Sequence, residues 1–431
     1  MNTDSDAVEQ PAQRGETWKK EWKPLLLLFL FAFLVRAAAV FLFSNFDSVT
    51  GFENEEIALN LVGGEGYSFK HFGLQMPTAF MYPLYTFFLA GHFLVFGHEW
   101  LPVELSQAFI GALGAPLLVL LAMRLTSRGP GWIAGLLYSV YPFYVYWVTK
   151  GQALTIEVVL LIGLVLAWER GVYKKGLKAS VLPGVLLGLA GLSKTLYLAF
   201  FPSFLLWTGL HRDVSWRQAL GFSFGALFFA LLVITPWTVR NAVSLERFVF
   251  ITDNTGFNLW LGNNPHATGG LFLPDQKHIT ETISPELKKE LRSAPTSPAQ
   301  DDIFKERAMS FIKHNPGRFL ELVPPRLRAL WYFDPYMPSS YGTLRSMVYL
   351  SLVLFAVAGM VISRREWRRL SIIYFQLITI TSVYAVFFGQ GRFRMVLEWG
   401  LIIFAAVTLY RLLSPLYGRL EGTFSGRKEG A

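Results

Sequence analysis

Long apolar stretches recur along the chain and alternate with polar loops. A run of about 20 apolar residues is the length that an α-helix needs to cross the hydrocarbon core of a bilayer. Ten stretches approach or reach this length: 24–43, 102–123, 131–149, 153–168, 179–194, 196–210, 218–238, 346–363, 370–388 and 396–412. The pattern predicts an all-α polytopic membrane protein with about ten transmembrane helices.

A further apolar stretch, 79–97, is ambiguous because it contains Pro83, His92 and many aromatic residues. If it crossed the membrane, every later loop would change sides and the usual excess of Lys and Arg in cytoplasmic loops would be reversed. If it lies at the interface, the inner loops collect these basic residues: Arg14, Lys19, Lys20, Lys23, Arg124, Arg128, Arg170, Lys174, Lys175, Lys178, Arg212, Arg217, Arg364, Arg365, Arg368, Arg369, Arg411, Arg419, Arg427 and Lys428. We therefore expect a juxtamembrane helix at 79–97 and both termini in the cytoplasm.

This topology divides the chain into parts with different environments. The expected parts are a cytoplasmic tail (1–23), a transmembrane core (24–238) that includes a first outer loop (44–101), a large outer segment (239–345), C-terminal transmembrane helices (346–412) and a cytoplasmic tail (413–431). Within the outer segment, Phe304, Ala308, Phe311 and Ile312 form one face of a helix predicted over 299–314. The outer segment is therefore expected to be mainly helical.

Composition agrees with a membrane protein and excludes other classes. Of the 431 residues, 53% are hydrophobic and 16% are charged, whereas soluble domains contain about 25% charged residues. The net charge of +9 fits basic cytoplasmic loops and does not indicate nucleic-acid binding. The chain has no Cys, so disulfides, thiol chemistry and Cys-based metal sites are excluded.

The first outer loop is acidic and contains a predicted short helix that starts near Glu53 and ends at Gly63-Gly64. One stripe of this helix holds Glu53, Glu56, Ile57 and Asn60. A carboxylate pair just outside the membrane suits a general base that acts on a hydroxyl. Thr50 and Glu53 also have the spacing of a capping box, so a purely structural role is the alternative.

Glu157 lies early in the stretch 153–168, near the expected outer end of that helix. A carboxylate is costly to bury in lipid, which favours a functional role. The alternative is a carboxylate at a helix start that reaches water.

Several basic residues are predicted at the outer face, against the positive-inside pattern: Lys150, Lys194, Arg240, Arg392 and Arg394. Clustered there, they could hold a phosphate group, or they could contact lipid headgroups. Trp260, Asn263 and Asn264 combine an aromatic ring with amides, which suits sugar hydroxyls but equally suits tight turns. No nucleotide-binding loop or hydrolase motif occurs in a usable context.

In their order along the chain, four stretches resemble the membrane glycosyltransferases of family 39 and its bacterial relatives, which form part of the GT-C class. They are Glu53–Tyr67, Pro77–Gly97, Thr235–Gly270 with Pro-Trp-x-x-Arg-Asn and Leu-Gly-Asn-Asn-Pro, and Arg392–Glu398. The class includes protein O-mannosyltransferases, the lipid A aminoarabinose transferase and polyprenyl-phosphate galacturonosyltransferases. The resemblance implies a GT-C-like fold over nearly the whole chain.

The resemblance also implies a catalytic base at the acidic residue that opens the first outer helix. In the class this residue is commonly Asp, often within Asp-Glu, whereas here Thr50-Gly51 occupies the place of a stricter match. Glu53 is the expected base, with Glu55 and Glu56 left open, and Glu157 corresponds to a second acidic residue of the class. Arg240, Arg392, Arg394 and Lys150 are the candidates for stabilising a lipid-phosphate leaving group.

The function implied is transfer of a sugar from a polyprenyl-phosphate donor to a hydroxyl of a lipid, glycan or protein acceptor, with inversion. Cationic residues beside a monophosphate leaving group require no divalent metal, so no metal or other cofactor is expected to be essential. The expected location is a bacterial inner membrane, with the active site facing the periplasm. A transporter or flippase of lipid-linked sugars is the alternative, although no repeated halves of the kind common in transporters are present.

Overall fold

The computed structural model describes residues 17–46, 49–174, 176–211, 213–332, 335–336 and 342–425. Each of the ten predicted apolar stretches falls on helical structure. The helices that contain them are α1 (Thr17–Phe43), α4 (Trp100–Leu125), α5 (Arg128–Val140), α7 (Leu154–Gly171), α8 (Val181–Ser193), α9 (Phe201–Gly209), α10 (Trp216–Ser244), α16 (Gly342–Ile362), α17 (Trp367–Val386) and α19 (Glu398–Ser425). The all-α prediction is thus confirmed, apart from one small hairpin.

Four helical segments of the described chain are long and apolar enough to cross a membrane: Glu21–Phe43, Trp100–Leu125, Trp216–Ser244 and Arg364–Val386. Other apolar stretches are divided into shorter pieces. Residues 131–149 form α5, α6 (Pro142–Tyr146) and the 3-10 turn η3 (Trp147–Thr149), because Pro142 has no N–H to continue the helix. The stretch after α8 begins with a 3-10 helix, η5 (Thr195–Phe200), before α9. Shorter 3-10 turns, η4 (Leu177–Ser180) and η7 (Arg364–Glu366), precede α8 and α17.

Arg36 of α1 stabilises the break after α5. Its guanidinium is fully buried and donates to the carbonyl oxygens of Ser139 and Ala32, each at 3.1 Å, and of Tyr138 at 3.2 Å. The last carbonyls of a helix lack intrahelical partners and carry partial negative charge. Arg36 is therefore buried, forms no ion pair with the described residues, and joins α1 to the end of α5.

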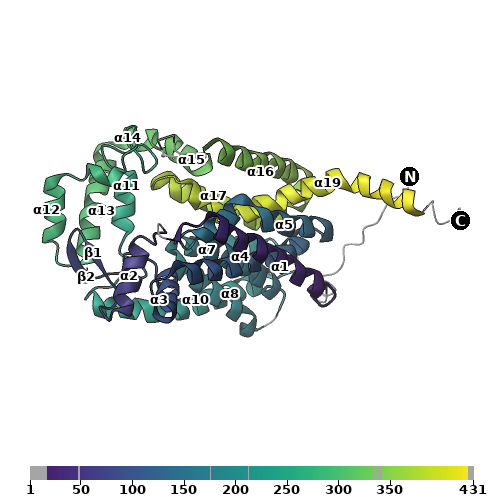
Figure 1. The fold of residues 1–431 in the computed structure, drawn as a ribbon, viewed down its shortest axis with the longest axis horizontal. Helices are drawn as coiled ribbons and strands as arrows, with labels where there is room; N and C mark the ends of the chain where they lie inside the picture. The colour runs from purple at the N-terminus through teal and green to yellow at the C-terminus, as the bar shows by residue number, and fades with distance from the viewer. Residues whose placement is uncertain are drawn as a thin grey trace.

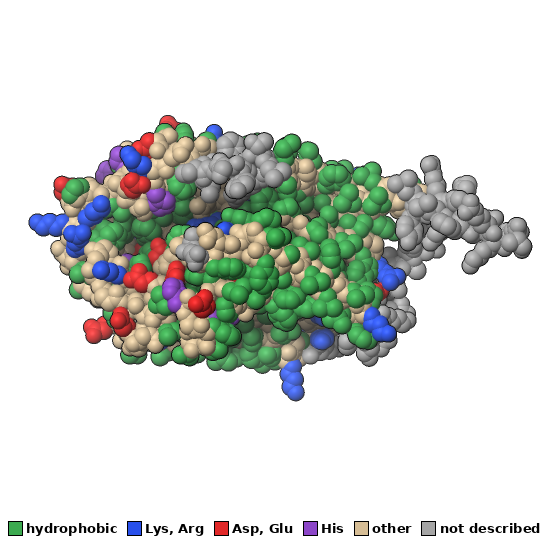
Figure 2. Space-filling view, in the orientation of Figure 1, with side chains coloured by type: hydrophobic (Ala, Val, Ile, Leu, Met, Phe, Trp, Pro, Cys, Tyr) green, Lys and Arg blue, Asp and Glu red, His purple; other side chains and the backbone are tan. Residues whose placement is uncertain are grey.

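The arrangement of helices agrees with a membrane orientation. In Figure 1, α19 ends at the side of the molecule opposite to the hairpin, α12 and α13. Figure 2 shows a broad band of hydrophobic side chains over the helical bundle, with most charged and histidine side chains gathered beyond it at the end that holds the hairpin. Large apolar side chains are exposed on this bundle, including Leu27, Phe228 and Leu354, as lipid-facing positions require.

The first outer loop folds into α2 (Glu53–Val62), an antiparallel hairpin of β1 (Ser68–His71) and β2 (Leu74–Pro77), and α3 (Pro83–Phe96). The α3 helix covers the stretch predicted as a juxtamembrane helix. It has 14 residues, fewer than the about 20 that a perpendicular crossing requires, and it packs against α2 and α8. Pro83 at its first turn and Gly97 after its end fix its boundaries.

The outer segment is mainly helical, as predicted. Its elements are α11 (Thr255–Gly262), the 3-10 turn η6 (Ile279–Thr282), α12 (Pro285–Ser293), α13 (Ser297–His314), α14 (Pro316–Glu321) and α15 (Val323–Trp331). Asp301 of α13 caps α11 by accepting from the N–H groups of Gly256 at 2.9 Å and Phe257 at 2.8 Å. This contact between a carboxylate and a helix N-terminus positions α11 and α13 side by side.

Candidate active site

Glu55 and Glu56 on α2 are engaged by contacts within the fold. The Glu55 carboxylate accepts from the Gly51 N–H at 2.8 Å and pairs with His98 at 2.6 Å. The Glu56 carboxylate accepts from the Lys70 N–H at 3.0 Å and so joins α2 to β1. The capping box considered for Thr50 and Glu53 is absent, because Phe52 is the residue that precedes α2 and no side chain caps it.

Glu53 differs from its two neighbours. It forms no hydrogen bond or ion pair with any part of the chain that the structure describes. Its side chain lines a cavity of about 210 Å³ between the hairpin and the outer segment. A carboxylate that faces a cavity without a partner can accept a proton from a ligand there.

A second group of charges lies where α7, α8 and α18 (Gly391–Met395) meet. Glu157 is 7% exposed and accepts from the Tyr197 hydroxyl at 2.7 Å. The Lys194 ammonium lies 4.2 Å from the centre of the Phe393 ring and interacts electrostatically with Glu157 and Arg392. The sequence predicts Lys194 as one of the outer basic residues, and in the structure its charge acts on Glu157.

Arg392 connects this group to Glu53. It donates to the Gln152 side chain at 3.0 Å, while its buried Nε has no partner among the described residues. Burial lowers the pKa of Arg392, and electrostatic interactions with Tyr384, Glu157 and Glu53 oppose that shift. Glu53, Arg392, Lys194 and Glu157 therefore form one electrostatically coupled site, although they come from four separate segments of the chain.

Two other predicted phosphate-binding residues have structural contacts instead. Arg240 donates to the carbonyl oxygens of Thr78 at 2.7 Å and Tyr67 at 2.8 Å, and so holds the hairpin against α10. Arg394 forms a buried ion pair with Glu398 at 3.0 Å, in which the side chains are 2% and 1% exposed. Lys150 lies over the Tyr146 ring, 4.6 Å from its centre, and its charge also acts on Glu104.

The predicted sugar-binding residues are buried in the outer segment and do not line the cavity. Asn263 donates to the carbonyl oxygens of Leu259 and Val386 and accepts from Arg326. Asn264 accepts from the His266 N–H at 2.9 Å, and Trp260 packs its ring against Phe304. These contacts match the tight-turn alternative.

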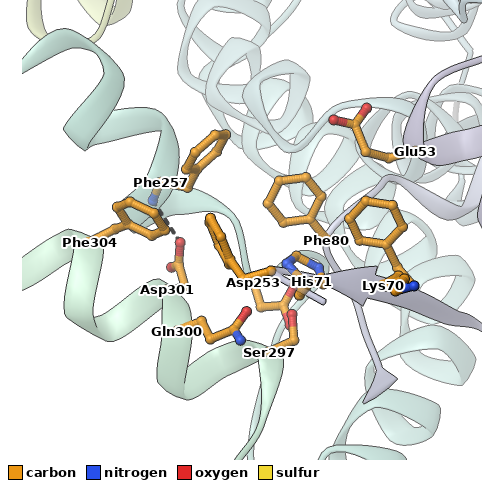
Figure 3. Close-up of a pocket in the computed structure, with 12 residues that line it drawn as sticks. Glu53, Lys70, His71, Phe80, Asp253, Phe257, Ser297, Gln300, Asp301 and Phe304 are labelled. Carbon is orange, nitrogen blue, oxygen red and sulfur yellow. Dashed lines mark hydrogen bonds between the residues drawn. The ribbon is translucent and has the colours of Figure 1, made fainter. Parts of the chain in front are cut away.

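The cavity also contains residues that the sequence did not single out. Figure 3 shows that they come from the hairpin and the loop after it, from the start of α11 and the loop before it, and from α13, with Glu53 at the opposite end of the view from Asp301 and Gln300. The lining residues other than Glu53 are Phe69, Lys70, His71, Phe72, Phe80, Asp253, Phe257, Ser297, Gln300, Asp301 and Phe304. Their spacing along the chain follows no motif.

Burial changes the protonation of two cavity residues. It raises the pKa of the Asp253 carboxyl to about 6, although Ser297 and the Ala79 N–H stabilise its charged form. It lowers the pKa of His71 to about 4, so the imidazole is neutral at neutral pH. No group of three metal-ligating side chains occurs among the residues described.

Comparison with known proteins gives a family match and a shared fold. Residues 77–239, less than half of the chain, match the family described as dolichyl-phosphate-mannose-protein mannosyltransferase. No curated protein matches the sequence. The oligosaccharyltransferase of Archaeoglobus fulgidus in the apo form has a TM-score of 0.57 and 13% identity, over 95% of this chain and 53% of that chain.

Two further structures were compared. The same archaeal enzyme tethered with an acceptor peptide has a TM-score of 0.56 and 14% identity, over 93% of this chain and 50% of that one. The present chain thus spans about half the length of the archaeal enzyme. ArnT from Cupriavidus metallidurans bound to undecaprenyl phosphate has a TM-score of 0.45 and 15% identity, over 90% of this chain and 77% of that chain.

The chain has the fold of the archaeal oligosaccharyltransferase, and residues 77–239 match the mannosyltransferase family. The resemblance to the family 39 enzymes is confirmed over these matched residues. The family match begins at the end of β2 and runs to the outer part of α10.

Proposed function

We propose that this chain transfers a sugar from a polyprenyl-phosphate-linked donor to a hydroxyl of an acceptor, at the outer face of the membrane. The description of the matching family names a donor of this chemical type, a dolichyl-phosphate-linked mannose. The observation that carries the proposal is the position of Glu53, a carboxylate without a partner in the described chain that both faces a cavity and acts on Arg392.

Glu53 is the general base of the proposed reaction. It takes the proton of the acceptor hydroxyl as that oxygen forms a bond to the anomeric carbon, while the bond from that carbon to the phosphate oxygen breaks. A single displacement of this kind inverts the anomeric configuration. Glu55 and Glu56 are less suited, because their carboxylates already accept hydrogen bonds from Gly51 and Lys70.

Arg392 and Lys194 stabilise the departing lipid phosphate. The phosphate gains negative charge as its bond to the sugar breaks, so a fixed cation stabilises the transition state more than the ground state. Glu157 positions this pair through its electrostatic contacts with both cations. Arg240 and Arg394 are not part of this step, since their donors bind carbonyl oxygens and Glu398. The two cations supply the charge stabilisation, and we propose that a divalent metal is not essential.

The proposed topology has ten transmembrane segments with both termini in the cytoplasm of a bacterial cell. The divided stretches at 131–149 and 179–210 cross the membrane as broken or tilted helices. A helix break inside a membrane is tolerated where other groups bind the backbone carbonyls at the break, as Arg36 does for Ser139 and Tyr138. The active site then faces the periplasm, and α3 forms one wall beside the donor lipid.

Replacement of Glu53 tests the function directly. Membranes that contain wild-type or Glu53→Gln protein are given a labelled polyprenyl-phosphate sugar, and label transferred to any acceptor is counted. We expect transfer to fall by a factor on the order of 10²–10⁴, the usual contribution of a general base. Glu65→Gln, an exposed carboxylate beyond the end of the same helix, is the matched control and should retain activity. Unchanged transfer in Glu53→Gln would reject the mechanism, and sugar-lipid flipping without transfer would favour a transporter.

A further inference from the structure

The cavity beside Glu53 has an aromatic wall and a polar end. The rings of Phe69, Phe80, Phe257 and Phe304 line it, together with the side chains of Asp253, Ser297 and Gln300. Figure 3 shows the last three side chains lying together at one end of the cavity. Its volume of about 210 Å³ is smaller than the roughly 300–1,000 Å³ of sites for drug-sized ligands. It therefore suits one small ring and not an extended polymer.

Two oxygen atoms at the polar end lack hydrogen-bond partners among the described residues. They are Asp253 Oδ1 and Gln300 Oε1, and their side chains are 5% and 2% exposed. The other halves of both groups are used: Asp253 Oδ2 accepts from the Ala79 N–H at 3.3 Å, and Gln300 Nε2 donates to the Leu291 carbonyl at 3.0 Å. These contacts fix both side chains in place. Unpartnered buried acceptors are rare and costly, so this end of the cavity is suited to a ligand that donates hydrogen bonds.

We propose that this cavity binds one sugar ring of a carbohydrate acceptor. Hydroxyl groups of the ring donate to Asp253 and Gln300, and its apolar face packs on the Phe80 and Phe257 rings. This inference rests on the proposed function and specifies the acceptor as a glycan. A peptide acceptor is less suited, because an extended peptide is typically bound along a strand edge through its backbone, whereas side chains enclose this cavity.

The position of the phosphate-binding residues separates acceptor from donor. Arg392 and Lys194 do not line the cavity, whereas Glu53 lines it and also interacts with Arg392. A donor whose phosphate binds Arg392 places its anomeric carbon on the side of Glu53 that faces Arg392. The cavity on the other side is then open to the acceptor, whose hydroxyl must approach Glu53.

The test measures carbohydrate binding without requiring catalysis. The purified full chain in lipid nanodiscs is mixed with methyl glycosides of glucose, galactose, mannose and N-acetylglucosamine, and with a Ser-containing tripeptide, and saturation transfer is recorded by NMR. We expect at least one glycoside to bind the wild type. Asp253→Asn and Gln300→Leu should each weaken that binding about tenfold, the usual effect of losing a hydrogen bond to a charged or buried group. The control is Asp302→Asn, which changes an exposed acid on α13, the helix that holds Gln300. It should bind the glycoside as the wild type does.

Binding of polyprenyl phosphate verifies that each variant is folded. The proposal is overturned if no glycoside gives saturation transfer, if both cavity variants bind as the wild type does, or if only the tripeptide binds. Glu53→Gln should retain glycoside binding. If glycoside binding depends on Asp253 but transfer does not depend on Glu53, the cavity assignment stands and the proposed base does not.

Discussion

Two arginines, the buried Arg36 in the helical bundle and the partly buried Arg392 at its outer end, use their hydrogen-bond donors differently. Both terminal nitrogens of Arg36 donate to backbone carbonyls at the end of α5. Arg392 has one side-chain acceptor, Gln152, within the described chain, and lies among the charges of Glu157, Lys194 and Glu53. The difference separates a cation that completes the fold from one with capacity left for a ligand.

Of the two arginines, Arg392 should have the larger effect on transfer. Replacement by Gln removes a cation where phosphate charge develops, and should reduce transfer by a factor on the order of 10²–10³. The protein should remain folded, because the lost contacts within the chain are few. Transfer and polyprenyl phosphate binding are measured in nanodiscs, with the exposed Arg364→Gln as control. Normal transfer and normal lipid binding in Arg392→Gln would show that the donor phosphate binds elsewhere.

At Arg36 the effect should be on stability. Arg36→Met removes the Arg36 donor to the buried Ser139 carbonyl, at a cost of about 1–3 kcal/mol. It also removes one of two donors to the Tyr138 carbonyl, which still accepts from the Tyr141 N–H. We expect a clear decrease in the thermal unfolding midpoint, while the protein that remains folded transfers sugar at the normal rate. A loss of activity at unchanged stability would show that the two arginines do not differ in the manner described.

Asp253 provides a pH-dependent test of burial in the outer cavity. Its pKa is raised to about 6 by burial, so ionisation disfavours the folded state more than the unfolded state. The stability of the wild type should therefore fall as pH rises from about 4 to 6 and then level off, by up to roughly 3 kcal/mol from this group. Asp253→Asn should lack this component, so its unfolding midpoint relative to the wild type should rise between pH 4 and 7. A constant difference would mean that the carboxylate is well solvated.

The smallest expected effect is at Lys194. Its ammonium lies against the Phe393 ring and acts on Glu157, so it is the second cation of the site. Lys194→Gln should reduce transfer about tenfold, since Arg392 still stabilises most of the phosphate charge. The measurement is sugar transfer by Lys194→Gln and by the wild type, compared at several salt concentrations. A loss greater than that of Arg392→Gln would reverse the order of the two cations.

The helices could be predicted because membrane-length apolar runs are local patterns. The breaks within them were not predicted, although Pro142 is a local signal for the end of α5. The second break depends on the extended backbone at Lys194, which no neighbouring residue type requires. The count of ten crossing segments therefore remains a prediction, whereas the helical positions of the apolar stretches are confirmed.

Glu53 could be located from the sequence because it opens a short acidic helix outside the membrane. The sequence does not distinguish it from Glu55 and Glu56, because the contacts that engage those two carboxylates are seen only in the structure. The partner of Glu55, His98, lies far along the chain from it. Arg240 and Asn263 have the residue types of binding sites, but contacts with distant backbone carbonyls give them structural roles. Such long-range contacts leave no pattern in a single sequence.

The same limit applies to the cavity. Asp253 and Gln300 come from different elements of the outer segment and meet the hairpin only in the folded protein. Neither residue has a neighbour in the sequence that marks it as a ligand-binding residue. Their unpartnered oxygen atoms are a property of the packing and not of the residue types.

The most direct test of the account compares Glu53→Gln and Arg392→Gln in one preparation, with polyprenyl phosphate binding and sugar transfer measured on the same nanodiscs. The account predicts that Glu53→Gln loses transfer and keeps lipid binding, whereas Arg392→Gln loses both. Equal losses of binding in the two variants, or full transfer in Glu53→Gln, would contradict the assignment of Glu53 as base and Arg392 as phosphate ligand.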